Sequence, residues 1–302
     1  MKRILLALLM LLTAGGTAWG GPVILGGDDL TDHGSRVLGA NLEGWLYIQK
    51  AIDNLNTSAT RPAASGIAAL GSAANPAFNG GNAGGAIGSA ADVLGLAVSF
   101  FDGAAAINGF FADLLAANVN PRIIWLAGTG AQNDLDNLEG AALTANAAAI
   151  NSFVSSGGGL MAHGSGPTAY GWLSALLPGL TETGGCSSGG ATLTPAGAAA
   201  FPGLSNSDID SNAGPCHSHF EGDFGGLVTL ALDGANPKRP YIIGGGSQTV
   251  IQCGQPNQPP CPTGVPEPSS LMLLGAGAIG LGWTIRRARS YKRPGGDRAP
   301  SV

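Results

Sequence analysis

PRIIWLAGTGAQNDLDNLEGAALTANAAAINSFVSSGGGLMAHGSG, residues 121–166, contains a complete strand–helix–strand pattern. The apolar run Arg122–Leu126 predicts a buried strand, and Leu160–Ala162 predicts another one directly after a run of glycines. Between them, apolar side chains recur at helical spacing, at Leu143, Ala147, Ile150 and Val154. A strand, a helix and a strand in this order are typical of a parallel sheet with helices on both faces. The stretch therefore predicts an α/β fold.

More segments of the same kind lie on either side of this stretch. Short apolar runs predict strands at Val23–Leu25, Gly226–Leu232 and Tyr241–Ile243. Two amphipathic helices are predicted by apolar stripes, at Trp45, Ile48, Ile52 and Leu55 and at Ile107, Phe110, Phe111, Leu114 and Leu115. Together these elements predict one α/β domain over residues 22–254, a length that is sufficient for a full core.

Three segments are harder to interpret from their composition. Residues 57–90 are rich in Gly, Ala, Ser and Asn with little periodicity, which predicts a flexible surface insertion. Val93–Phe101 fits either a strand or another buried segment, and Thr168–Leu177 suggests a helix.

The run RIIWLAG followed by INSFVSSGGGLMAHGSG resembles the class I glutamine amidotransferase-like superfamily. LTPAGAAAFPGLSN, HSHFEGDFG and RPYIIGGG, later in the chain, are similar to its non-catalytic members. The resemblance implies a flavodoxin-like fold with a mostly parallel sheet. It also implies a nucleophilic cysteine on the turn after the Leu160–Ala162 strand, but this chain has His163, Gly164 and Ser165 there. The glutaminase activity is therefore not expected here.

Both ends of the chain have features of an exported protein. Lys2 and Arg3 precede the apolar run Ile4–Leu12, and small residues follow it, as in a secretory signal peptide over residues 1–21. Cleavage is expected between Ala18 and Pro22, by signal peptidase after transport by the export machinery.

The C-terminal end begins with a Pro-rich linker, residues 255–265, and continues with Pro266, Glu267 and Pro268. An uncharged apolar run follows, and residues 269–285 predict a transmembrane helix, since about 18 residues span the hydrocarbon core. Arg286 and Arg287 begin a basic cluster, and residues 290–302 form a basic tail that is expected to stay in the cytoplasm.

Pro-Glu-Pro, an apolar span and arginines in this order resemble the PEP-CTERM sorting signal of Gram-negative bacteria, here over residues 266–289. The resemblance implies that an exosortase, a membrane-embedded cysteine protease, recognises the signal and removes the tail. It implies a precursor anchored in the inner membrane, and then a cell-surface or secreted protein. An ordinary C-terminal membrane anchor is the alternative interpretation, but it leaves Pro266–Pro268 unexplained.

The net charge of the exported part limits the kinds of molecule that it is expected to bind. The whole chain carries a net charge of −5, but the basic residues concentrate at its two ends. The exported part therefore carries about −11, which disfavours nucleic acid and anionic lipid as partners. Cations and neutral glycans, such as an exopolysaccharide, are compatible with this charge.

Four cysteines in an exported chain predict two disulfides. Three pairings are open, and the preferred one joins Cys186 to Cys216 and Cys253 to Cys261. Neither C-x-x-C nor a zinc-finger spacing occurs, so no structural zinc site is predicted.

The candidate binding residues follow the ends of predicted strands, where open α/β sheets bind ligands. They are Asp28, Asp29, Asp32, His33, His163, His217 and His219. Such carboxylates and imidazoles can hold a divalent metal, the one cofactor that the pattern favours. The structural alternative is that the aspartates cap helices and turns while the histidines are ordinary loop residues. We expect Asp29, His33 and His163 to face one cleft if a site exists.

Two functions remain open from the sequence. The first is an exported surface or extracellular-matrix protein with a non-catalytic α/β domain. The second is a secreted hydrolase or metal-dependent enzyme that uses the Asp/His cluster. A serine hydrolase is disfavoured because Ser165 does not lie in a G-x-S-x-G motif.

Overall fold

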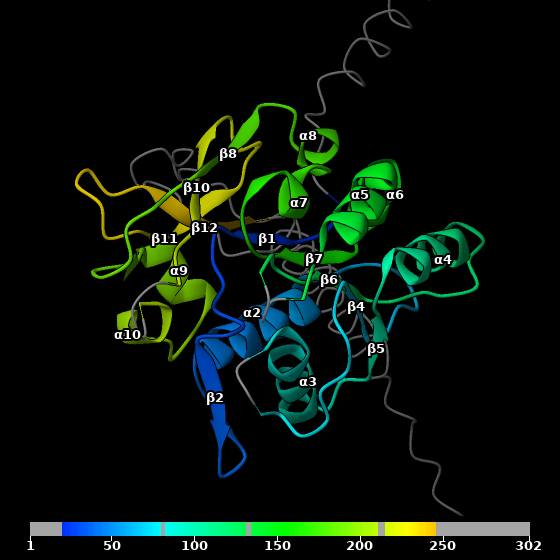
Figure 1. Ribbon diagram of the computed structural model, residues 1–302, viewed down its shortest axis with the longest axis horizontal. Helices are drawn as coiled ribbons and strands as arrows, with labels where there is room; N and C mark the ends of the chain where they lie inside the picture. Colours follow the sequence, from blue (N-terminus) through cyan, green and yellow to red (C-terminus); the bar gives the residue numbers. More distant parts are fainter. Residues whose placement is uncertain (1–19, 80–81, 131–133, 211–214, 246–302) are drawn as a thin grey trace, which may run out of the picture. The chain divides into compact units, whose positions relative to one another are not determined.

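The fold is organised around one eight-stranded sheet (Figure 1). The computed structural model describes residues 20–79, 82–130, 134–210 and 215–245. Five strands are mutually parallel, namely β5 (Val98–Phe101), β4 (Ile67–Leu70), β6 (Ile123–Leu126), β7 (Gly159–Ala162) and β1 (Val23–Gly26), in this spatial order. Three antiparallel strands extend the sheet beyond β1, namely β12 (Pro240–Gly245), β11 (Val228–Leu232) and β9 (Thr192–Leu193). The sheet is therefore mixed and mostly parallel, and the α/β fold is confirmed.

The first strand of the chain lies at the inner end of the parallel part. Ile24 and Leu25 pair with Met161 and Ala162 on one side and with Gly244 and Ile243 on the other. In a flavodoxin-like sheet, with the spatial order 2-1-3-4-5, the place beside the fourth parallel strand belongs to the fifth and last one. In this protein β1, the first strand of the chain, occupies the place beside β7, so the carboxyl ends of β1 and β7 are neighbours at one edge of the sheet.

The helices lie in two groups on opposite sides of the sheet (Figure 1). On one side are α2 (Gly44–Ser58) and α3 (Ala83–Leu94). On the other are α4 (Ala104–Leu115), α5 (Asn137–Ala145), α6 (Ala147–Ser155), α7 (Gly166–Tyr170) and α8 (Leu173–Leu176). The short helices α9 (Pro195–Ala200) and α10 (Asn206–Ile209) precede the antiparallel strands β11 and β12.

The two predicted apolar stripes are buried as expected, with one exception. All four stripe residues of α2 are fully buried, and so are Ile107 and Phe111 of α4. Leu115, the last residue of α4, is instead 69% exposed, whereas its neighbour Leu114 is buried.

The prediction of a flexible insertion over residues 57–90 is wrong. This segment contains the strand β4, which lies between β5 and β6 in the sheet, and most of the helix α3. Small residues allow close packing here: a Cβ on Gly85 would lie 2.9 Å from the Trp45 ring. Asn82 caps α3 by accepting a hydrogen bond from the Gly85 N–H. The Gly/Ala composition therefore reflects packing rather than disorder.

Two predicted helices are each divided into shorter ones. Asn146 leaves helical geometry, so α5 and α6 replace one helix over residues 143–154. The segment Thr168–Leu177 contains the end of α7 and all of α8, with a break at Gly171 and Trp172. Val93–Phe101 contains the end of α3 and the strand β5.

Two small antiparallel pairs complete the described structure. One joins β2 (Gly34–Val37) to β3 (Ala40–Glu43), and the other joins β8 (Leu180–Gly184) to β10 (Ser218–Gly222). No helix among the described residues is long and apolar enough to cross a membrane. The predicted signal peptide up to residue 19, the predicted linker, the predicted span 269–285 with the sorting signal and the predicted basic tail lie outside the described residues.

Candidate functional site

The loops after β1 and β7 meet at the carboxyl edge of the sheet, because these neighbouring strands are parallel. Asp28 and Asp29 follow β1, and His163 follows β7 directly. The Gly164 N–H donates a hydrogen bond of 2.8 Å to the Asp28 carbonyl and joins the two loops. The structure divides the predicted site residues at this edge into separate groups.

Asp28 and His163 form the first group, which is wholly buried. His163 is 1% exposed, and its Nδ1 lies 2.9 Å from Asp28 Oδ1. The indole Nε1 of Trp125 donates to His163 Nε2 at 3.2 Å. Because an indole N–H can only donate, Nε2 accepts and the proton is on Nδ1, which donates to Asp28. Both ring nitrogens are therefore engaged within the protein.

The Asp28 carboxylate is bonded to its own loop as well as to His163. Its Oδ1 also accepts a hydrogen bond from the Leu30 N–H at 3.1 Å, whereas its buried Oδ2 has no hydrogen-bond partner among the described residues. A Cβ on Gly26 would lie 1.7 Å from Oδ2, so a side chain at this position would displace the Asp28 carboxylate. Burial, and then the nearby charge of Asp28, raise the pKa of Tyr47 and Tyr170.

Asp29, Asp32, His33 and His217 form the second group, which is nearer to solvent. His217 Nε2 lies 2.6 Å from Asp29 Oδ2, and the His217 side chain is 47% exposed. His33 Nε2 lies 3.3 Å from Asp29 Oδ1 and 3.6 Å from Asp32 Oδ1. Ligand atoms of Asp29, Asp32 and His33 all lie within 4.8 Å of one another. These three ligand atoms are close enough to one another to reach a single cation.

The charges of the second group are strongly coupled. Burial raises the pKa of Asp29, but its interactions with His217 and His33 outweigh burial and hold the pKa below its usual range. Burial and the neighbouring charge of Asp29 raise the pKa of Asp32 to about 6. The hydrogen bond to Asp29 raises the pKa of His217. Asp29 is therefore the negatively charged member of the group, and His33 and His217 both pair with its carboxylate.

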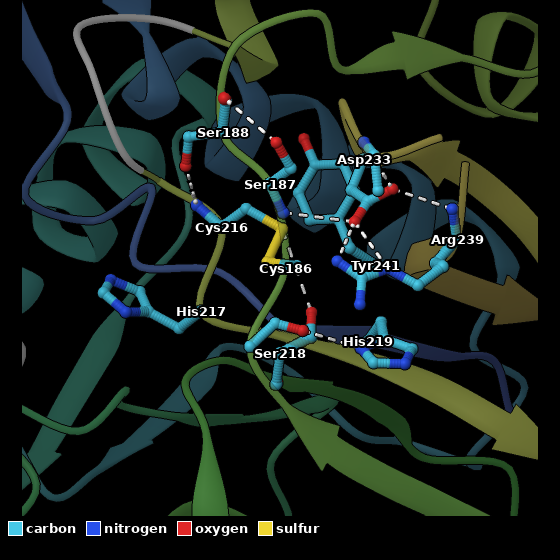
Figure 2. Close-up of a disulfide and its surroundings, with 12 residues drawn as sticks. Cys186, Ser187, Ser188, Cys216, His217, Ser218, His219, Asp233, Arg239 and Tyr241 are labelled. Carbon is cyan, nitrogen blue, oxygen red and sulfur yellow. Dashed lines mark hydrogen bonds and ion pairs between the residues drawn. A yellow bond between two sulfur atoms is a disulfide. The ribbon is translucent and has the colours of Figure 1, made fainter. Parts of the chain in front are cut away.

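A disulfide between Cys186 and Cys216 holds the segment that presents His217 (Figure 2). Their Cα atoms are 5.7 Å apart, and the predicted pairing is confirmed for these two residues. The His217 N–H donates to the Gly27 carbonyl at 2.8 Å, while the Asp29 N–H donates to the Pro215 carbonyl at 2.9 Å. The segment is thus paired with the loop after β1. Cys253 and Cys261 lie outside the described residues.

His219 belongs to neither group. Figure 2 shows the rings of His217 and His219 well apart from each other, with Ser218 between them. His219 Nδ1 lies 2.8 Å from the Gly185 carbonyl oxygen, and Nε2 lies 3.1 Å from Glu221 Oε1. The structure therefore brings His217 to the Asp29 cluster but turns His219 away from it.

Asp233, which the sequence analysis did not select, organises the neighbouring loop (Figure 2). It is fully buried and accepts hydrogen bonds from the backbone N–H groups of Ser187, Ala235 and Arg239 and from the Arg239 guanidinium. Burial raises the pKa of Asp233, but these hydrogen bonds outweigh burial and lower it overall. An Asp-Gly turn at residues 233–234, followed by Arg239, is the sequence signal for this arrangement.

Replacing Asp233 by Asn is expected to lower the free energy of unfolding by about 1–3 kcal/mol at pH 7. The amide places an NH₂ group among donors and removes the charge that Arg239 pairs with. Because the folded-state pKa is below the ordinary value of 3.8, the contribution of the carboxylate is present above that pH. It is lost as the pH falls through the lowered pKa.

Urea denaturation of both proteins at pH 7 and at pH 3 measures this difference. Asp223→Asn is the matched control, since Asp223 is exposed and accepts a local hydrogen bond from Gly225. Equal stability of the Asp233→Asn and Asp223→Asn variants at pH 7 would contradict the assignment.

The fold and this edge define an α/β domain with an Asp/His cluster held against its first strand. No curated protein and no solved structure matches the chain. Residues 264–287 match the model of the PEP-CTERM protein-sorting motif. The motif marks an exported protein that an exosortase sorts and processes, associated with the membrane and cell surface of a Gram-negative bacterium.

Proposed function

We propose that the α/β domain is the non-catalytic, ligand-binding part of a surface or extracellular-matrix protein that exosortase cleaves from its membrane anchor. The observation that carries this proposal is the state of His163. It occupies the turn after β7, where the amidotransferase-like superfamily has its nucleophile, and both of its ring nitrogens are engaged by Asp28 and Trp125. A side chain that is buried and fully hydrogen-bonded in this way holds the turn together and has no atom left for a substrate.

The cysteines support the same conclusion. Cys186 and Cys216 are joined to each other, and no cysteine among the described residues has a free thiol. A glutaminase assay tests this part of the proposal. The exported protein is expected to release no ammonia from glutamine above the rate of a heat-denatured sample, and turnover would overturn the non-catalytic role.

The charge of the exported part supports a binding role in a matrix. A net charge of about −11 keeps the domain away from anionic surfaces and favours cations or neutral exopolysaccharide.

A secreted hydrolase or metal-dependent enzyme is the second candidate, and one observation favours it. His217 is half-exposed and its Nε2 is bonded to the buried Asp29, an arrangement that orients an imidazole for proton transfer. Ester or peptide hydrolysis by the exported protein that is lost in His217→Gln, but kept in Glu221→Gln, would favour this candidate over the binding role.

Replacing Glu267 by Ala is expected to abolish C-terminal processing, because Glu267 is the charged centre of the Pro-Glu-Pro motif. Intact-mass measurement in the native host reports the result. The wild-type protein should lack Arg286 and Arg287, whereas the Glu267→Ala protein should retain them and stay in the membrane fraction.

The matched control for this experiment is Pro259→Ala, in the linker and outside the matched motif. It should be processed like the wild type. Retention of residues 286–302 in the mature wild-type protein would exclude exosortase processing and leave an ordinary membrane anchor.

A further inference from the structure

The loop after β1 contains three side chains that converge on one point. The sequence DDLTDH places Asp29, Asp32 and His33 within one turn, and the Asp32 N–H donates to the Asp29 carbonyl at 2.9 Å. This hydrogen bond folds Asp32 back over Asp29. His33 Nε2 then lies between the two carboxylates, 3.3 Å from Asp29 Oδ1 and 3.6 Å from Asp32 Oδ1.

Two carboxylate oxygens in this group are buried beside the His33 ring. Within the described residues, the His33 ring is the only group paired with Oδ1 of Asp29 and Oδ1 of Asp32, and Asp29 as a whole is 8% exposed. Buried carboxylate oxygens without donors are costly, so in native proteins they usually have a partner such as a water or an ion. Both of these oxygens lie next to His33 Nε2.

The separations match those between ligands of one ion. A tetrahedral zinc ion binds imidazole nitrogen and carboxylate oxygen at about 2.0–2.2 Å, which places neighbouring ligand atoms about 3.3–3.6 Å apart. The two distances to His33 Nε2 fall in this range. One imidazole and two carboxylates are a donor set suited to zinc, whereas calcium prefers six or more oxygens.

Hydrogen bonds and close packing attach the loop to the start of helix α2. The Trp45 indole donates to the Thr31 carbonyl at 2.7 Å, and the Gly44 N–H donates to the His33 carbonyl at 3.0 Å. A Cβ on Gly44 would lie 2.1 Å from the Leu30 carbonyl oxygen, so helix α2 starts in direct contact with the loop. The ligands are therefore held in place by the core of the domain.

We propose that Asp29, Asp32 and His33 bind one Zn²⁺ ion through Asp29 Oδ1, Asp32 Oδ1 and His33 Nε2. His217, bonded to the other oxygen of Asp29, orients that carboxylate from behind. Three protein ligands leave a coordination position for a water or for an oxygen of a bound ligand. The inference rests on the proposed binding role and names the cation through which the domain would bind.

The test is a zinc titration of the tag-free exported protein after treatment with a chelator, with bound metal measured by mass spectrometry. The wild type should bind one zinc per chain, and Asp32→Asn and His33→Gln should each weaken binding at least 10-fold. His217→Gln should weaken it less. Glu221→Gln is the matched control, since Glu221 pairs with His219 outside the group, and it should bind like the wild type.

Histidine NMR of the wild-type protein gives a second readout that needs no variant. The ring resonances of His33 should shift when zinc is added, and those of His219 should not. A wild type that binds no zinc, binding that is unchanged in both Asp32→Asn and His33→Gln, or an unshifted His33 ring would overturn the zinc site. The glutaminase and processing experiments are independent of zinc, so this failure would leave the proposed binding role intact.

Discussion

Replacing His163 by Leu is expected to lower the free energy of unfolding by about 3–5 kcal/mol. The leucine removes the N–H that donates to Asp28 Oδ1 and the nitrogen that accepts from the Trp125 indole. Asp28 is fully buried, so its carboxylate would keep one backbone donor, from Leu30, and lose its only side-chain donor in the described structure. Urea denaturation of the exported protein at pH 7 measures the change.

A double-mutant cycle separates this electrostatic effect from loss of packing. Asp28→Asn keeps an oxygen for the Leu30 N–H but removes the charge, so the Asp28→Asn/His163→Leu protein should be less destabilised than the sum of the single variants predicts. Additive losses, or a His163→Leu effect below about 1 kcal/mol, would show that the two side chains are not coupled in the way the structure indicates.

Removing the disulfide with Cys186→Ser/Cys216→Ser is expected to cost about 3–4 kcal/mol of stability. The bond closes a loop with a sequence separation of 30, and loop closure in the unfolded chain accounts for a cost of this size. A second consequence is local. The segment at residues 215–218 that presents His217 would be held only by its backbone hydrogen bonds to the loop after β1.

Denaturation under non-reducing conditions, compared with the wild type, measures the global effect. Cys253→Ser/Cys261→Ser is the matched control, because it also removes two cysteines but at positions that follow β12 in the chain. Loss of stability by the control alone would contradict the prediction. Hydrogen exchange at the amides of His217 and Ser218 reports the local effect, and it should speed up only when Cys186 and Cys216 are replaced.

The prediction for residues 57–90 failed for a physical reason that applies to other small-residue segments. Ala68 and Ala69 form the middle of β4, with β5 on one side and β6 on the other. A strand buried on both faces needs little amphipathic alternation, and small side chains there allow helices to pack closely. Composition alone therefore does not distinguish such a strand from a flexible linker.

The sequence by itself determined the elements whose signals lie within one segment. The helical spacing of Leu143, Ile150 and Val154 predicted which face of that segment is buried. RIIWL predicted the strand β6, and Pro266–Pro268 with the following apolar run and arginines predicted the sorting motif. Each of these depends on the spacing of residues that are close in the chain, and such spacing is visible in one dimension.

Only the tertiary structure decided which histidine meets which aspartate. Because β1 lies beside β7, His163 reaches Asp28 and is buried with it, while the neighbouring Asp29 turns toward His33 and His217. Adjacent residues in an extended segment point in opposite directions, so a shift of one residue in register would exchange these partners. Strand order and register are set by packing among segments that are far apart in the chain. No local pattern contains that information. For this reason the sequence predicted which residues belong to the candidate site but not which of them pair with one another.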